Sequence, residues 1–452
     1  MKGQALLLCT LVTVALLSLL PVTVGIADNA HPVIGYQTLP HSMYNMADTV
    51  IKLNSSNDES VVAAYPINTS IVIITTQRIV TVNADDLNES TSTTIPAGRV
   101  IVASYNGRGT VYLASYIGGE GSTLVYAYRV NKGLVKVAVI PGYPWDIDSK
   151  DGYIALVVHA PGKGLQVWEL AGHGKWNATI PGDIIDPDLA SYMKVAVSPQ
   201  GYAAFYAGGE GFEAVLVYNG TGRVVYKKTF KNLYSMGRYY SLAAWSPDGR
   251  ALAVLSYSKT EQNYKLEVLN ATTWKHIWSM SVETPVNPVE GLVFNPTGCC
   301  LYYQYTAGSY MVVNATSGSI IGYGGWEPVV TRIYGWTSNG AWSVLARTGG
   351  LRGLALIGML GSPLITFEYD PLMWSVGDRA VSVPPVNAGF LGDGRVWLVQ
   401  VYGGEARVAV IDWPKYAIAY FDPGPFRDYY KGITVRDGAG GQWNGWLVPL
   451  IP

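Results

Sequence analysis

The sequence predicts an all-β fold, a single β-propeller of about eight four-stranded antiparallel blades, and three observations carry that prediction. A polar turn between two apolar strands recurs along the chain at intervals of about 42 to 54 residues. Further strand and turn signals divide each interval into four short strands. No long window in the body of the chain shows the hydrophobic period of a helix. Four short strands in a repeat of this length are typical of propeller blades.

The clearest repeat unit is Trp245-Ser246-Pro247-Asp248-Gly249-Arg250, which is followed by an apolar strand. Similar turns occur at Ser198-Pro199-Gln200-Gly201 and Asn295-Pro296-Thr297-Gly298. Looser copies place turns at Asn57-Asp58, Asn106-Gly107, Asp151-Gly152, Asn339-Gly340 and Asp393-Gly394. Because the first, seventh and eighth copies are degenerate, seven blades with a decorated edge are the alternative to eight.

The Trp245–Arg250 stretch resembles the repeat of WD40-like and TolB-like β-propellers, and the resemblance covers about residues 48 to 422. It implies the propeller fold but leaves the function open, because propellers serve as binding scaffolds and also host many chemistries. It also implies that the loops between blades and the turns between second and third strands open on one face. A blade cannot bury both of its faces alone, so the blades must stack and the ring must close.

The N-terminus predicts export. Lys2 precedes an apolar run from Ala5 to Leu20, and small residues follow at Gly25-Ile26-Ala27. This pattern is typical of a signal peptide cleaved after Ala27. A pilin-like processing site near Lys2 and a lipobox at Leu8-Cys9 are weaker alternatives, and the first of them would retain the apolar segment as an anchor.

We therefore divide the chain into a signal peptide (1–27), an N-terminal extension (28–47), the propeller (48–422) and a C-terminal extension packed on the propeller (423–452). No other stretch approaches the roughly 18 apolar residues of a membrane-spanning helix. The mature chain is expected to lack a membrane span unless its N-terminal segment is retained, and to work outside the cell or on its surface.

Seven Asn-X-Ser/Thr sequons make the exported chain a predicted glycoprotein. The same residue types also form tight turns, so a purely structural role is the alternative. The sequons are at Asn54, Asn68, Asn88, Asn177, Asn219, Asn270 and Asn314.

Aromatic and charged residues gather in the stretches between blades, which predicts a ligand-binding face. Such side chains hold sugars or peptide segments. Some of these aromatic residues could instead be packing anchors between blades. The candidates are Tyr143, Trp145, Asp183, Asp186, Asp188, Tyr192, Arg238, Tyr239, Tyr240, Trp326, Glu327, Arg332, Tyr369, Asp370, Trp374, Asp378 and Arg379, with Glu120, Glu210 and Glu405 from three Gly-Gly-Glu turns.

Charge and motif content exclude some functions. A net charge of -1 gives no basic field for nucleic acid. The stretch Asp146–Gly152 imitates a calcium loop, but its spacing does not fit an EF-hand and it aligns with an ordinary blade turn. No Gly-X-Ser-X-Gly nucleophile motif occurs. We predict no catalytic residue, no metal ligand and no cofactor.

An enzyme remains the alternative because of one feature, the adjacent pair Cys299-Cys300. Some exported quinoprotein dehydrogenases, which are eight-bladed propellers, contain a disulfide between adjacent cysteines, and this resemblance would imply pyrroloquinoline quinone (PQQ) with Ca²⁺ as cofactor. Their repeated tryptophan motif is not matched. The pair forms either a vicinal disulfide or two thiols, and we favour thiols because unpaired Cys is often buried. The prediction is therefore an exported β-propeller that binds a glycan, peptide or protein partner.

Overall fold

The computed structural model describes residues 36–39, 44–171, 174–232, 238–282, 291–305, 309–324, 330–337, 342–348, 353–358, 364–367, 369–376, 379–413, 416–419, 432–436 and 442–449. The described residues all belong to one compact unit within Pro32–Pro452. The predicted signal peptide (1–27) lies outside the described residues. Within the described ranges, no helix is long and apolar enough to cross a membrane.

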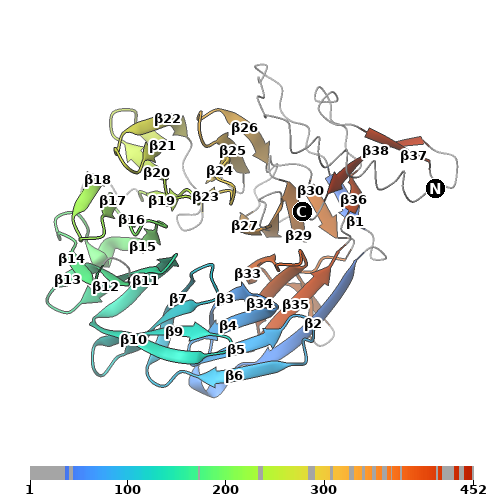
Figure 1. Cartoon of the computed structure of the whole chain (residues 1–452), viewed down its shortest axis with the longest axis horizontal. Coiled ribbons are helices and arrows are strands. Elements are labelled where there is room, and N and C mark those ends of the chain that lie inside the picture. The colour runs from blue at the N-terminus through green and yellow to red at the C-terminus, as the bar shows by residue number, and fades with distance from the viewer. Residues whose placement is uncertain are drawn as a thin grey trace. The chain divides into compact units, whose positions relative to one another are not determined.

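Eight antiparallel four-stranded sheets form the blades of the propeller (Figure 1). The first four blades contain β3 (Val61–Ile67), β4 (Ser70–Thr75), β5 (Arg78–Asn83) and β6 (Ser90–Thr94); β7 (Arg99–Tyr105), β8 (Val111–Ile117), β9 (Ser122–Arg129) and β10 (Gly133–Pro141); β11 (Tyr143–Lys150), β12 (Tyr153–Ala160), β13 (Gly164–Ala171) and β14 (Trp176–Thr179); and β15 (Ala190–Val197), β16 (Ala203–Gly209), β17 (Phe212–Tyr218) and β18 (Val224–Lys231).

The last four blades complete the ring, so the prediction of eight blades is confirmed and the alternative of seven is wrong. They contain β19 (Leu242–Trp245), β20 (Ala251–Ser258), β21 (Asn263–Asn270) and β22 (His276–Val282); β23 (Leu292–Phe294), β24 (Cys300–Tyr305), β25 (Ser309–Asn314) and β26 (Ile320–Gly324); β27 (Val330–Trp336), β28 (Trp342–Thr348), β29 (Gly353–Gly358) and β30 (Leu364–Phe367); and β33 (Pro385–Phe390), β34 (Val396–Tyr402), β35 (Glu405–Asp412) and β2 (Asn45–Lys52).

The ring closes through a strand from the other end of the chain. The outer strand of the eighth blade is β2, which pairs antiparallel with β35 and places Thr49 opposite Val408. This pairing covers the outer edge of β35 and joins the two ends of the propeller segment. The boundary predicted at residue 48 falls inside this strand. A second N-terminal strand, β1 (Tyr36–Leu39), adds to the seventh blade by parallel pairing with β30.

Three further features lie outside the regular blades. The hairpin of β31 (Met373–Val376) and β32 (Arg379–Ser382) connects the seventh blade to the eighth. A separate sheet contains β36 (Tyr416–Ala419), β38 (Gln442–Pro449) and β37 (Gly432–Arg436), with β38 in the middle. Two short 3-10 turns, η2 (Ser55–Asn57) and η3 (Pro187–Leu189), lie in connections between blades.

The hydrophobic core lies between consecutive blades. One buried cluster joins Ile73 of the first blade to Trp397 of the eighth, and another joins Phe205 of the fourth to Val157 of the third. The first strands of successive blades also contact one another, for example β7 with β11 and β11 with β15. This arrangement follows from apolar strands that each need a neighbouring sheet to cover them.

Local turn chemistry explains why the repeat was visible in the sequence. Ser246 Oγ hydrogen-bonds to Asp248 Oδ1 at 2.6 Å, and the N–H of Gly249 donates to the carbonyl of Ser246 at 2.8 Å. Gly249 has a φ of 67°, a conformation that glycine adopts without strain. These contacts lie within a few residues, so short motifs specify them.

One predicted repeat position is wrong. The Asn57-Asp58 turn lies between β2 and β3, in the connection that enters the first blade. The turn between the first two strands of that blade is at Asn68-Thr69. Asp58 and Asn68 both have left-handed backbones, with φ of 58° and 55°, so the two turns use the same chemistry.

The turn between third and fourth strands contains an unusual residue in the fifth blade. Trp274 has a φ of 58° at the position where Gly222 and Gly318, with φ of 76° and 74°, lie in neighbouring blades. Its ring stacks on Tyr226 at 6.1 Å and meets the edge of Tyr202 at 5.4 Å. A left-handed backbone costs a non-glycine residue about 1–2 kcal/mol, so ring packing must offset the strain.

Candidate functional site

The connections between blades lie at the same end of the propeller as the turns between second and third strands. The N–H of Gly142, between two blades, donates to the carbonyl of Gly121 in such a turn at 2.8 Å. The N–H of Leu53 donates to the carbonyl of Gly404 in the same way at 3.0 Å. We call this end the inter-blade face. It is the face on which the sequence placed the candidate binding residues.

Tyr192 is a packing residue between the fourth and fifth blades. Its ring is 5% exposed. Its hydroxyl donates to the carbonyl of Ser241 and accepts from the N–H of the same residue, both at 2.6 Å. Ser241 follows 49 residues later, one blade further along the chain. Tyr192 is therefore a packing anchor between blades, which was the alternative to ligand binding for the aromatic candidates.

Tyr143 and Trp145 lie together at the start of the third blade. Tyr143 is exposed and meets Tyr116 edge to face with ring centroids 5.0 Å apart. Trp145 is half-buried, 6.3 Å from Tyr143, and packs against the core between the third and fourth blades. The pair therefore combines one surface ring with one packing ring.

Arg238 and Glu210 are brought together although they come from different segments. Their backbones form an isolated antiparallel bridge, and both residues are exposed. The neighbouring Tyr239 packs on Phe230 at 4.7 Å and on Tyr257 at 5.0 Å. The backbone pairing thus brings Arg238, Tyr239 and Glu210 close together on the inter-blade face, and a binding role for them stays a prediction.

Five of the other acidic candidates are exposed or half-exposed. Asp183, Asp186 and Asp188 are exposed around η3, where Asp186 accepts from the N–H of Asp188 at 3.0 Å. Glu120 is exposed in its turn and Glu405 is half-exposed at the start of β35. These carboxylates are spread around the ring.

Three large exposed side chains lie on the β31–β32 hairpin, in the segment before it or at the neighbouring end of β34. Tyr369 is 64% exposed, Tyr402 44% and Met373 40%. Trp374, a predicted binding residue, is buried, and its ring centroid lies 6.3 Å from that of Tyr402. We call Tyr369, Met373 and Tyr402 the hairpin patch.

Buried polar side chains of the eighth blade fix this hairpin. Arg407, buried in β35, donates through Nη1 to the carbonyl of Met373 at 2.9 Å, and Gln400 Nε2 donates to the carbonyl of Leu372 at 2.9 Å. Arg407 Nε also pairs with Asp48 Oδ2 at 2.6 Å. Because Asp48 belongs to the closing strand β2, the patch is attached to the ring closure. The sequence analysis did not single out Arg407, although a single charged residue within an apolar strand is a signal that could have identified it.

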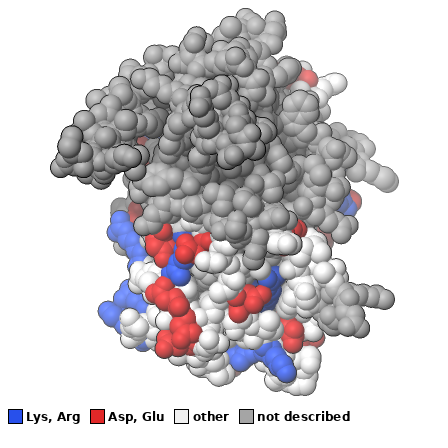
Figure 2. All heavy atoms as spheres, turned by 90° about the vertical axis from the view of Figure 1, so that its right-hand side faces the viewer, with Lys and Arg blue, Asp and Glu red and all other residues white. Residues whose placement is uncertain are grey.

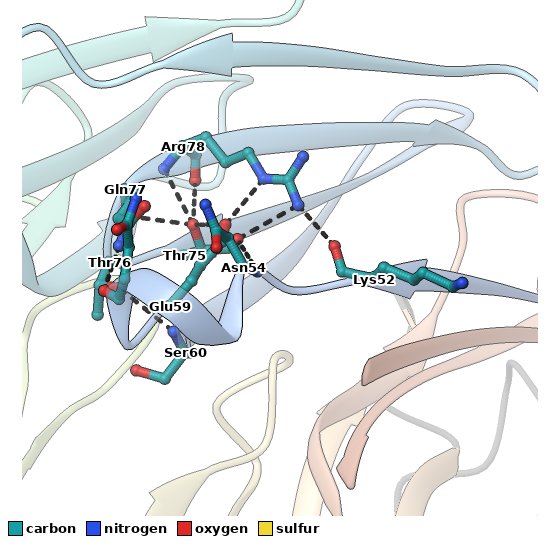
Figure 3. A network of polar contacts seen from close by, with 9 residues as sticks. Lys52, Asn54, Glu59, Ser60, Thr75, Thr76, Gln77 and Arg78 are labelled. Carbon is teal, nitrogen blue, oxygen red and sulfur yellow. Dashed lines mark hydrogen bonds and ion pairs between the residues drawn. The ribbon is translucent and has the colours of Figure 1, made fainter. Parts of the chain in front are cut away.

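A second polar network braces the entry to the first blade (Figure 3). Glu59 accepts from Arg78 Nε at 2.8 Å, from Thr75 Oγ1 at 2.7 Å and from the N–H of Asn54 at 2.7 Å. Arg78 Nη2 reaches the carbonyl of Lys52 in β2 at 2.7 Å. Burial raises the pKa of the Glu59 carboxyl. The hydrogen bonds from Arg78, Asn54 and Thr75, together with the positive charge of Arg78, outweigh burial and hold this pKa below its usual range.

A cleft of about 370 Å³ adjoins this network, lined by Lys52, Leu53, Asn54, Glu59, Gln77, Arg78 and Thr94. Because the Glu59 carboxylate and the Arg78 guanidinium bind each other and the surrounding backbone, both groups serve to join β2 to the first blade. A second cleft, of about 420 Å³, lies among turns of the opposite end, lined by Gln200, Tyr202, Asn219, Gly220, Gly249, Arg250, Ala271 and Thr272.

The stretch Asp146–Gly152, which imitates a calcium loop in the sequence, forms most of β11 and the turn that follows it. Asp146 Oδ2 accepts from the N–H of Val195 at 2.9 Å, and Asp148 Oδ2 accepts from the N–H of Val197 at 2.7 Å, so the two carboxylates join the third blade to the fourth. Burial raises the pKa of Asp146 to about 6, although Lys194 opposes this. Among the residues that the structure describes, no group of three or more His, Cys, Asp or Glu side chains could hold a metal.

Glu213 is a buried acid that the sequence analysis did not single out. It is 1% exposed in β17, and its Oε1 accepts from the N–H of Tyr257 at 2.7 Å. Its Oε2 has no hydrogen-bond partner. Burial raises the pKa of this carboxyl to about 8. A single acid within the apolar strand Phe212–Tyr218 is the signal that could have found it.

The sequons lie mainly at the end opposite the inter-blade face. Asn68, Asn88, Asn219, Asn270 and Asn314 occupy turns between first and second or third and fourth strands. Asn177 is in β14, and Asn54 lies in an inter-blade connection. In Asn219, Asn270 and Asn314 the side-chain oxygen accepts backbone N–H groups of its own turn. Their role in turns is therefore established, and glycosylation stays a prediction.

Cys299 and Cys300 also lie at that opposite end, at the turn into β24. Cys299 is exposed, Cys300 is buried, and the two are not joined by a disulfide in the structure. Of the other candidates, Trp326, Glu327 and Asp378 lie outside the described residues. Arg332 and Arg379 are described only as strand residues, in β27 and β32.

No protein-family model matches this sequence, and no curated protein matches it. Among solved structures, the chain is similar to Sqt1 from Chaetomium thermophilum, with a TM-score of 0.50 and 13% identity over 82% of this chain and 100% of that chain. BamB from Moraxella catarrhalis matches with a TM-score of 0.48 and 10% identity over 82% and 100%. A chain of the mitotic checkpoint complex matches with a TM-score of 0.43 and 12% identity over 68% and 88%.

At these identities the likeness is one of fold alone. The predicted resemblance to WD40-like and TolB-like β-propellers is confirmed at that level by the eight-bladed architecture and by the match to Sqt1.

Proposed function

We propose that this chain is an exported binding scaffold that takes a protein or peptide partner through the hairpin patch on its inter-blade face. The observation that carries the proposal is that Tyr369 and Met373 are exposed on an insertion that buried side chains hold in place, and that the exposed Tyr402 of the eighth blade contacts Trp374 of the same insertion. Clustered exposed apolar side chains mark interaction sites.

The residue types of the patch favour a protein partner. Tyr and Met are enriched at protein interfaces, where large rings bury much surface for little loss of side-chain entropy. The hydrogen bonds of Arg407 and Gln400 to the hairpin backbone fix the patch before binding. A surface fixed in this way loses little conformational entropy when the partner binds.

Electrostatic attraction has a small part in this proposal. The chain carries a net charge of -1. On the side drawn in Figure 2, acidic and basic side chains are interspersed over the described surface. Mixed charges of this kind steer a partner weakly. Apolar contact at the hairpin patch is therefore expected to dominate affinity.

Photo-cross-linking tests the proposal. The photoreactive residue p-benzoylphenylalanine replaces Tyr402 in the full chain, and in a matched control it replaces Val135, which is 60% exposed on the outer strand β10. Both proteins are irradiated with the envelope fraction of the source organism. We expect a discrete cross-linked protein from position 402 that is absent from position 135 and that Met373→Ser diminishes.

Two results would overturn the proposal. Identical products from both positions would show that the patch has no selectivity, and a sugar adduct alone at position 402 would show a glycan partner. Export has its own test, the N-terminal sequence of the protein purified from its source. A chain that begins at Asp28 supports it, and a chain that retains residues 1–27 contradicts cleavage.

A further inference from the structure

The two adjacent cysteines touch, although consecutive residues of a strand point to opposite faces. Sγ of Cys299 lies 2.6 Å from Sγ of Cys300. Unbonded heavy atoms normally keep about 3.5–4 Å between them. The contact arises because Cys299 directly follows the left-handed Gly298, with a φ of 76°, and precedes the extended part of β24. The turn therefore holds both sulfur atoms on one side of the chain.

The surroundings of the two thiols differ. Cys299 is exposed, whereas Cys300 is 2% exposed and packs with Tyr302 and Val312 between the sixth and seventh blades. The hydrogen bond from Cys300 lowers the pKa of the Cys299 thiol, and the same contact, with burial, raises the pKa of Cys300. An accessible thiolate beside a protected thiol is the arrangement found at redox-active cysteines.

We propose that Cys299 and Cys300 form a reversible dithiol–disulfide pair that reacts by exchange with a soluble disulfide. The Cys299 thiolate attacks one sulfur of that disulfide, which forms a mixed disulfide and releases one thiolate. The thiol of Cys300 then loses its proton and attacks Sγ of Cys299, which releases the second thiolate. The protein is oxidised by two electrons, and the soluble disulfide is reduced to two thiols.

Closing this bond acts on the turns of the sixth blade. The carbonyl of Cys299 accepts from the N–H of Ala315 at 2.9 Å, which joins the turn before β24 to the turn before β26. The disulfide ring contains the peptide bond between the two cysteines, so that carbonyl is part of it. Adjacent α-carbons are closer than ordinary disulfide geometry prefers, so the bond is expected to be readily reduced.

Thiol counting by intact mass tests the proposal on the full chain in a Cys9→Ser background. The reduced protein is equilibrated with oxidised glutathione, acid-quenched and alkylated with N-ethylmaleimide in denaturant. We expect a product that is lighter than the reduced protein by two hydrogen atoms and carries neither glutathione nor N-ethylmaleimide. Reduction of this product with dithiothreitol, followed by alkylation, should give the doubly alkylated form. Two alkylations after oxidation, a stable glutathione adduct or a covalent dimer would each overturn the proposal.

Two variants test the order of the steps and control for misfolding. Cys300→Ser should accumulate a glutathione adduct at Cys299, because no second thiol resolves it. Cys299→Ser should take up glutathione far more slowly, because Cys300 is buried. Equal uptake by the two variants would show that Cys299 is not the attacking thiol. Unchanged melting temperatures of the reduced variants would show that both remain folded.

Discussion

Glu213 should make the stability of the fold fall as pH rises through the neutral range. Its carboxyl is 1% exposed and its Oε2 has no hydrogen-bond partner, so the charged form is poorly solvated. Burial raises the pKa from its ordinary 4.5 to about 8, against the opposing effects of the Tyr257 N–H and the Lys228 charge. Between those two values the unfolded chain has released this proton and the folded chain retains it.

The sign and size follow from proton linkage. The folded state binds more protons from about pH 4.5 to about pH 8, so the free energy of unfolding decreases as pH rises through that interval. One pKa unit corresponds to about 1.4 kcal/mol. The group should therefore contribute full stability below pH 4.5 and lose about 3 kcal/mol of it between pH 5 and pH 8.

Substitution of Glu213 by Gln isolates this contribution. The amide oxygen of Glu213→Gln can still accept from the N–H of Tyr257, but the side chain no longer titrates. Guanidinium chloride unfolding at pH 5, 6, 7 and 8 should show the variant gaining about 3 kcal/mol relative to the natural chain across the series. Glu210→Gln, which changes an exposed carboxylate nearby, should follow the natural chain at every pH. A constant difference between Glu213→Gln and the natural chain would refute the reasoning.

Three other substitutions test the packing of blades and hairpin. Tyr192→Phe leaves the N–H and carbonyl of Ser241 without their partner and should cost about 2 kcal/mol in a melting experiment, whereas Tyr143→Phe at the surface should cost nothing measurable. Arg407→Met removes charge-assisted hydrogen bonds, should cost about 2 kcal/mol and should expose the β31–β32 hairpin to limited proteolysis; resistance equal to that of the natural chain would contradict its anchoring role. Trp274→Gly relieves about 1 kcal/mol of backbone strain and loses about 3 kcal/mol of ring packing, so a net loss of about 2 kcal/mol is expected, and a more stable variant would show that the strain dominates.

The blade repeat was predictable because its signals are local. Ser246, Asp248 and Gly249 hydrogen-bond to one another within four residues, so their spacing in the sequence is their spacing in the turn. The same local character explains the error in the first blade. Asp58 and Asn68 adopt the same left-handed conformation in turns that connect different strands. Turn chemistry identifies a turn but does not say which strands it joins.

The candidate site was less predictable because its contacts are distant in the sequence. Tyr192 was grouped with surface residues, yet its partner Ser241 lies one blade further along. Tyr143 is also a tyrosine in the first strand of a blade, yet it stays 39% exposed although its ring meets Tyr116 of the neighbouring blade. A sequence without aligned relatives does not show which of two tyrosines a neighbouring blade will bury. Whether these rings bind a ligand stays a prediction.

The closing strand gives the propeller a physical link between its integrity and its proposed binding surface. Asp48 in β2 pairs with Arg407, and Arg407 also holds the backbone of the hairpin that carries Met373. In the eighth blade β2 has one strand neighbour, β35, so it can separate without breaking the other blades. Separation would remove the ion pair from Arg407 and thereby loosen the hairpin. A partner that binds only the ordered patch must therefore also stabilise the closed ring. The coupling is reciprocal: closure of the ring increases the partner's binding free energy by the same amount by which the bound partner stabilises closure.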